Sequence, residues 1–205
     1  MSATERVVAY IDGFNLYFGI RAKGRRHLWL DLEALVKSLL SSQQQLVAIR
    51  YFTASVRNDP PAEQRQQLYL NALSAHSSKV EIRLGRFQEK TKQCRACRSS
   101  WSEYEEKETD VSLAVSLVED GVNGLYDTAL IVSADSDMCP AVRAIKRLRP
   151  SVRVVAALPP KRRSFALQGL CDATIPIGMA KVRQSQLPEQ VTAGSQSYAR
   201  PSHWR

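Results

Sequence analysis

Four aspartates are the residues of this 205-residue chain whose types and spacing best indicate chemistry. Asp12 follows the apolar run at 7–11, Asp135 and Asp137 follow the apolar run at 128–132, and Asp110 comes just after Thr109. Taken alone, each aspartate is typical of a turn or a helix cap. Crowded carboxylates, however, repel one another unless some are protonated or a cation neutralises them. The set therefore predicts a site for Mg²⁺ or Mn²⁺, which prefer oxygen ligands and can activate a water towards a phosphodiester.

The surrounding pattern predicts elements that bring these aspartates together. Apolar runs at 7–11, 46–53, 128–132 and 152–158 are typical of buried strands, and the alternating run at 80–84 is typical of a more exposed one. Helical spacing follows at 32–40, 60–75, 110–118, 140–148 and 165–170, and 173–177 is a last strand. Gly85 is expected to end the regular part of the third strand.

Strands that alternate with helices imply an α/β fold with a mostly parallel sheet covered on both faces. Ligands of such sheets bind beyond the carboxyl ends of the strands, where the strand order reverses. The strands that end at Asp12 and Asp135 are therefore expected to be neighbours, with their carboxylates converging. Asp110, in the first turn of a helix, would point into the same crevice.

Two segments stand apart from this domain, which is predicted to span residues 1–182. Residues 87–106 are charged and irregular, and we interpret them as an insertion that carries Cys94 and Cys97. These cysteines form half of a zinc knuckle, and a structural Zn²⁺ there is disfavoured because a complete site needs four ligands. Residues 183–205 are polar and poor in large apolar side chains, which is typical of a flexible tail.

The formal net charge of +9 favours a polyanionic partner such as nucleic acid. Lys161, Arg162 and Arg163 follow the strand at 152–158, at the same edge as the aspartates, where they could hold a phosphate backbone. No run of apolar residues is long enough to cross a bilayer and the first residues lack the pattern of a signal peptide, so a cytoplasmic protein is expected. The sequence leaves self-association open.

Three segments resemble the motifs of the NYN domain family, which are PIN-like ribonuclease domains. They are Tyr10-Ile-Asp-Gly-Phe-Asn15, Glu108-Thr-Asp110-Val-Ser-Leu and Ile131-Val-Ser-Ala-Asp135-Ser-Asp137, and the resemblance spans about residues 6–178. It implies a three-layer α/β/α, Rossmann-like fold and metal-dependent cleavage of RNA, with the four aspartates at the acidic positions. It also implies that Asn15 and Ser133 hydrogen-bond a metal-bound water or the scissile phosphate, although both could equally be local turn formers.

The function we predict is hydrolysis of single-stranded RNA, because an open acidic crevice can present an extended phosphate chain to its ions. Two other functions remain as alternatives. One is a regulatory RNA-binding protein of the same fold that does not cleave. The other is a phosphatase like the haloacid dehalogenases, since Asp135-x-Asp137 after an apolar strand also resembles their paired aspartates. That pattern normally begins its domain, whereas here it comes late and leaves Asp110 without a role.

Overall fold

A computed structural model describes residues 4–205, except for the side chains of residues 87–89 and 102–106. Its main sheet has the strand order β4-β3-β2-β1-β5-β6-β7, and every neighbouring pair is parallel except β3 and β4. The strands are β1 (Glu5–Asp12), β2 (Gln44–Ala54), β3 (Val80–Gln93), β4 (Ser100–Lys107), β5 (Thr128–Val132), β6 (Arg153–Leu158) and β7 (Ala173–Pro176). The order reverses at β1, so β1 and β5 are neighbours, as the sequence predicts.

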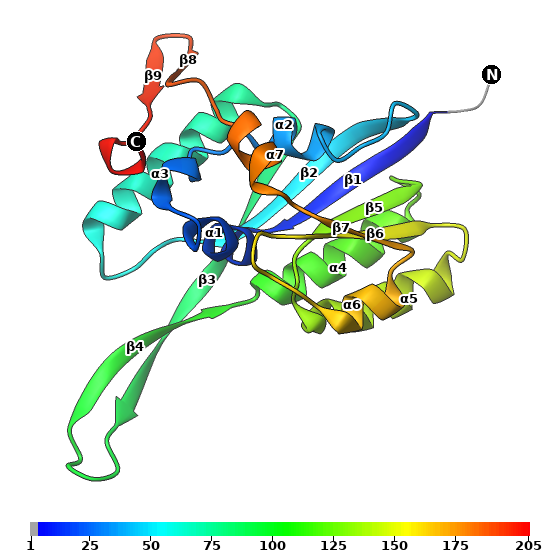
Figure 1. The fold of residues 1–205 in the computed structure, drawn as a ribbon. Helices are drawn as coiled ribbons and strands as arrows, with labels where there is room; N and C mark the ends of the chain where they lie inside the picture. The colour runs from blue at the N-terminus through cyan, green and yellow to red at the C-terminus, as the bar shows by residue number, and fades with distance from the viewer. Residues whose placement is uncertain (1–3) are drawn as a thin grey trace.

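Helices cover both faces of this sheet and give a three-layer α/β/α fold (Figure 1). They are α1 (Gly13–Arg21), η1 (Arg25–His27), α2 (Leu32–Lys37), α3 (Pro60–His76), α4 (Thr109–Val122), η2 (Ser136–Met138), α5 (Cys139–Leu148), α6 (Phe165–Leu170) and α7 (Met179–Gln184). The helix α1 is absent from the pattern predicted above. None of the helices within residues 4–205 is long and apolar enough to cross a membrane.

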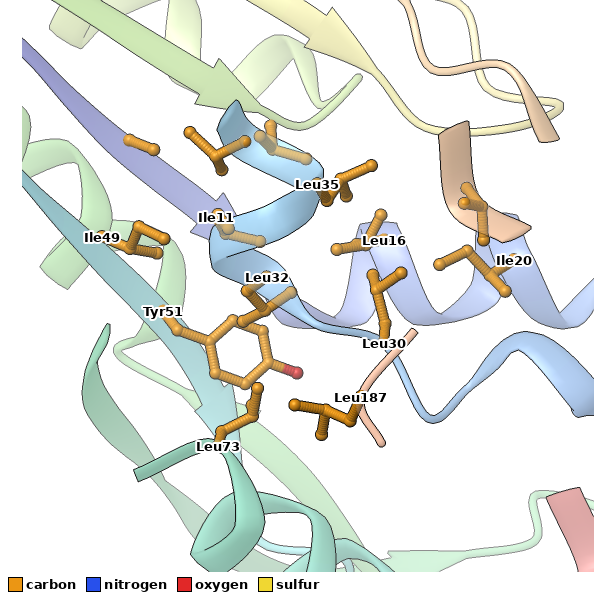
Figure 2. Packing of buried hydrophobic residues seen from close by; sticks show 14 of the residues in the cluster. Ile11, Leu16, Ile20, Leu30, Leu32, Leu35, Ile49, Tyr51, Leu73 and Leu187 are labelled. Carbon is orange, nitrogen blue, oxygen red and sulfur yellow. The ribbon is translucent and has the colours of Figure 1, made fainter. Parts of the chain in front are cut away.

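The two faces of β1 build two separate cores, because side chains alternate across a strand. Val7, Ala9 and Ile11 pack with residues of α1, α2 and α3, and Figure 2 shows Leu16, Leu32 and Leu35 around Ile11. On the other face, Val8 and Tyr10 pack with residues of α4 and α5. Burial on both faces explains why β1 appears in the sequence as a continuous apolar run.

The predicted insertion is a long antiparallel hairpin. Residues 80–85 of β3 pair with β2, and residues 86–93 then pair with β4. The prediction that Gly85 ends the regular part is therefore wrong, because β4 returns along β3 and satisfies its backbone beyond the sheet. Figure 1 shows this hairpin extending away from the three layers.

The segment predicted to be a flexible tail is packed on the domain in this structure. After α7, the chain forms the hairpin β8 (Gln190–Ala193) and β9 (Gln196–Ala199) and the short helix η3 (Ser202–Trp204). Trp204 is buried, and its ring lies 6.3 Å from that of Trp29 and 5.9 Å from that of Tyr69, centroid to centroid. A few large side chains therefore anchor a segment that is polar on average.

Candidate active site

The site is built around Asp12, the last residue of the central strand β1. Asp12 is only 6% exposed and is the N-cap of α1, where its Oδ1 accepts a hydrogen bond from the Asn15 backbone N–H at 2.9 Å. The start of α1 can pack closely on β2 because residue 13 is glycine: a Cβ at Gly13 would lie 2.6 Å from the carbonyl oxygen of Phe52. The carboxylate is thus fixed at the carboxyl edge of the sheet.

A network of hydrogen bonds joins Asp12 to the loop after β5. The Ser133 hydroxyl donates to Asp12 Oδ2 at 2.9 Å and accepts from the Asp135 backbone N–H at 3.1 Å. The Asn15 side-chain oxygen accepts from the Ala134 backbone N–H at 3.2 Å. Ser133 is fully buried, so in this structure it positions Asp12 and Asp135 and does not face solvent, where a phosphate would bind. Asn15 likewise clamps the two loops together.

The remaining aspartates lie at the same edge of the sheet and are less closely tied to Asp12. Asp135 caps η2, with its Oδ1 accepting the Asp137 backbone N–H at 2.9 Å, and the side chain of Asp137 is exposed. Asp110 is half-buried in the first turn of α4, a helix that contacts both β1 and η2. The structure therefore brings all four predicted aspartates to one edge.

The donor set fits a hard divalent cation in part. Asp12 and Asp135 are close enough for their charges to interact, and Mg²⁺ is commonly held by one or two carboxylates together with waters and substrate phosphates. Among the side chains that the structure describes, however, no three His, Cys, Asp or Glu residues are grouped as a metal centre. Within that part of the chain, the close convergence of all four carboxylates predicted from the sequence is therefore not seen.

Burial raises the pKa of Asp12 above its ordinary value, and the charge of Asp135 raises it further. The hydrogen bonds from Asn15 and Ser133 oppose this by stabilising the carboxylate. Because the folded protein then binds this proton more tightly than the unfolded chain does, the contribution of Asp12 to stability falls as the pH rises through the raised pKa. The ionised form of Asp12 is thus held in the fold at a cost to stability.

Asp12→Asn is therefore expected to raise the free energy of unfolding at neutral pH, since asparagine can keep the bond to the Asn15 N–H without the charge. The gain over wild type should shrink as the pH is lowered and Asp12 becomes protonated. Urea unfolding at a series of pH values measures it, with Asp137→Asn on the exposed part of the same loop as a control for the change in net charge. If the gain in the free energy of unfolding grew towards acid pH, the buried charge of Asp12 would not be its cause.

The predicted basic residues Lys161, Arg162 and Arg163 follow β6 in an exposed turn at the same edge of the sheet. The turn packs on α1, where a Cβ at Gly19 would lie 2.9 Å from both Pro159 Cβ and the Pro160 carbonyl oxygen. The packing of the turn on α1 keeps these three exposed side chains at the edge of the sheet where Asp12 lies. Their role in holding a backbone stays a prediction.

A pocket that the sequence analysis missed begins beside Asp12. It has a volume of about 480 Å³ and lies between α1, α3, η1 and η3. The Tyr51 ring forms part of its wall and packs against Gly13, and burial together with the Asp12 charge raises the pKa of Tyr51. The available signal in the sequence was the aromatic and basic stretch after Asp12, which includes Tyr17, Phe18 and Arg21.

The two cysteines of the insertion lie in the turn at the end of the long hairpin. The Cys94 and Cys97 side chains interact, and hydrogen bonds from Ser99 and Cys94 lower the pKa of Cys97 to about 7. Cys139 and Cys171 belong to the layer formed by α5 and α6, so the four cysteines do not form one site.

Comparison with known proteins places this chain in a recognised family. The family model of the NYN domain matches residues 6–178. In solved structures, a protein of unknown function from Vibrio parahaemolyticus is similar, with a TM-score of 0.56 at 18% identity over 87% of this chain and 96% of that one. The parallel sheet covered on both faces gives this chain the three-layer α/β/α architecture of PIN-like domains, and the solved structure shares this fold. The chain belongs to the NYN domain family.

One curated relative has a different chemistry in its name. The chain is 30% identical over 188 residues to 6-hydroxy-3-succinoylpyridine 3-monooxygenase HspA of Pseudomonas putida. The match covers 75% of this chain and 59% of that protein, so the chain spans less than two thirds of the relative's length. The family supports a fold of the nuclease type.

Proposed function

We propose that this protein is a metal-dependent ribonuclease that hydrolyses phosphodiester bonds of single-stranded RNA. The observation that carries the proposal is the position of Asp12: a buried carboxylate at the carboxyl end of the central strand, bonded through Ser133 to the loop that bears Asp135. Membership of the NYN family supports it, because the family's three acidic motifs are all present.

Each side chain of the site would have a distinct role. Asp12 and Asp135 would hold Mg²⁺ or Mn²⁺, which supplies a water of lowered pKa and neutralises charge on the scissile phosphate. Asp110 and Asp137 would complete the acidic edge. Ser133 and Asn15 position the two segments, since each bonds the chain that follows β5 to the chain at the end of β1.

The RNA strand would approach over the basic turn at residues 161–163. The exposed Lys161, Arg162 and Arg163 can pair with backbone phosphates, and their contacts carry no base preference. We also propose that the protein acts in the cytoplasm.

Cleavage of labelled single-stranded RNA in the presence of Mn²⁺ or Mg²⁺ tests the proposal. The wild-type protein should cut, and a double variant, Asp135→Asn with Asp137→Asn, should not. Equal cleavage by both proteins would end the assignment. RNA that is bound by both proteins and cut by neither would favour a regulatory RNA-binding protein, and faster turnover of a phosphomonoester than of RNA would favour a phosphatase.

A second candidate is oxygenation of an aromatic acid, favoured by the relative named as a monooxygenase and by the aromatic pocket beside Asp12. A monooxygenase inserts one oxygen atom of O₂ into its substrate and reduces the other to water with two electrons from a donor. Incubating the protein with 6-hydroxy-3-succinoylpyridine, O₂ and a reduced nicotinamide would reveal it as substrate-dependent oxidation of the nicotinamide. No such oxidation beside clear RNA cleavage would reject this candidate.

A further inference from the structure

The pocket beside Asp12 has the composition of a site for an aromatic ring that carries negative charge. Its volume of about 480 Å³ is within the range of small-molecule sites. Aromatic side chains from α1, β2, α3 and η3 line it: Phe14, Tyr17, Phe18, Tyr51, Tyr69 and Trp204. Tyr17 and Phe18 are 36% and 45% exposed, so these two side chains are not buried in the core and can contact a ligand.

The charge of the pocket is strongly positive. Arg21, Arg25 and Arg65 all line it, and in the part of the chain whose side chains are described none of them is paired with a carboxylate. Arg21 lies over the Tyr17 ring, 5.8 Å from its centroid, and Arg25 is bonded to the ring nitrogen of His203. The pocket's acidic residue, Asp59, uses its carboxylate to cap α3 through the Ala62 N–H at 3.1 Å.

This pocket combines two features that bind single-stranded nucleotides: guanidinium groups without a carboxylate partner among the described side chains, and exposed aromatic rings beside them. Guanidinium groups form charge-assisted, often paired hydrogen bonds to phosphate. Aromatic rings stack on bases whatever the base, which gives affinity without sequence preference. A duplex offers no free base face to such a pocket, whereas a single strand does.

We propose that this pocket binds one unpaired nucleotide, with the base among the rings of α1 and the phosphate on Arg21, Arg25 and Arg65. The pocket begins at Gly13, the residue after Asp12, so a nucleotide held there would lie next to the acidic edge. The assignment of that nucleotide to an RNA strand rests on the proposed ribonuclease function. Binding of the nucleotide itself does not.

Titration calorimetry of the full chain with adenosine monophosphate tests the proposal. Adenosine monophosphate should bind, whereas adenosine and inorganic phosphate should each bind at least about 10-fold more weakly, because each lacks one of the two recognised groups. Arg65→Ala and Tyr17→Ala should each weaken binding by at least about 5-fold. Arg147→Ala, an exposed arginine of α5 outside the pocket, is the matched control and should leave binding unchanged.

Both pocket variants change partly exposed side chains on helix surfaces, so thermal unfolding should show that they fold like the wild type. Equal affinity of wild type and both variants would overturn the proposal. Tighter binding of benzoate than of adenosine monophosphate would also overturn it, in favour of an aromatic carboxylate.

The nucleotide-binding test and the RNA-cleavage test can give different results. Nucleotide binding that depends on Arg65 and Tyr17 would support the pocket even if RNA is never cut. RNA cleavage with an unchanged KM in Arg65→Ala and Tyr17→Ala would leave the nuclease standing and remove the pocket from its substrate path.

Discussion

Asp12→Asn is expected to reduce the rate of RNA cleavage by at least about 100-fold while the protein stays folded. Asparagine has nearly the same shape as aspartate and can still accept the Asn15 N–H, so α1 should keep its start. It has no negative charge, however, and therefore binds a divalent cation far less well than a carboxylate does. Single-turnover cleavage of labelled RNA at saturating Mn²⁺ measures the loss.

A matched control for this variant is Asp31→Asn. Asp31 is also a buried aspartate that caps a helix, accepting the Ala34 N–H of α2 at 3.0 Å, but it lies outside the Asp12–Ser133–Asn15 network. Its variant should cleave RNA at the wild-type rate. A second readout is the melting temperature, which Mn²⁺ should raise in wild type more than in Asp12→Asn. Full activity of Asp12→Asn would remove Asp12 from the mechanism.

The opposite effects expected on stability and cleavage have one cause. Asp12 is buried next to Asp135, and this raises its pKa and makes its charge costly to the folded protein. Replacing the charge should stabilise the protein and abolish the proposed activity. Such a trade is common where a site is kept polar for function.

The sequence predicts those elements of the fold whose buried residues follow a regular pattern along the chain. The apolar runs that became β1 and β5 are buried on both faces, so they predict strands and the loops that follow them. Since parallel neighbours end at the same edge, the meeting of Asp12 with the Asp135 loop follows from the same pattern. The close grouping of four carboxylates did not follow, because it depends on side-chain directions within η2 and α4.

The helix α1 was missed for a physical reason. It contains Gly13 and Gly19, which are poor helix formers, and Phe14, Tyr17 and Phe18, which lie on a partly exposed face and blur the helical pattern. Both glycines are needed by tertiary contacts, at Phe52 on one side and at Pro159 and Pro160 on the other. Asp12 is the local signal for this helix, because an aspartate at that place is typical of a helix cap, but no clear helical spacing follows it in the sequence.

The packed C-terminal segment was hidden for another reason. Residues 183–205 are polar on average, and an average over the window cannot reveal single anchoring side chains such as Leu187, Val191 and Trp204. Their partners lie about Trp29 and Tyr69, far away in the chain. Long-range contacts of this kind leave no periodic pattern.

Trp29→Ala is expected to lower the free energy of unfolding by about 3–5 kcal/mol, a large share of the stability of a typical domain. Trp29 is fully buried, its ring packs against those of Tyr69 and Trp204, and its Nε1 donates to the Pro188 carbonyl oxygen at 2.7 Å. Alanine would leave a cavity and an unbonded carbonyl. Urea unfolding measures the change, and Trp101→Ala on the exposed hairpin, where the ring is 49% exposed, should shift it by less than about 0.5 kcal/mol.

The same substitution should loosen the C-terminal segment before the whole domain unfolds. Residues 29–31 hold that segment through backbone bonds from the Leu187 N–H to the Trp29 carbonyl at 3.0 Å and from the Asp31 N–H to Ser185 at 2.9 Å. With the indole gone, these bonds lose the packing that shields them, so limited proteolysis should cut at residues 189–197 earlier than in wild type. Because Trp204 also lines the nucleotide pocket, nucleotide affinity should fall together with protection. If the protease cut Trp29→Ala at the wild-type rate, the C-terminal segment would be held by its backbone contacts and not by this cluster of rings.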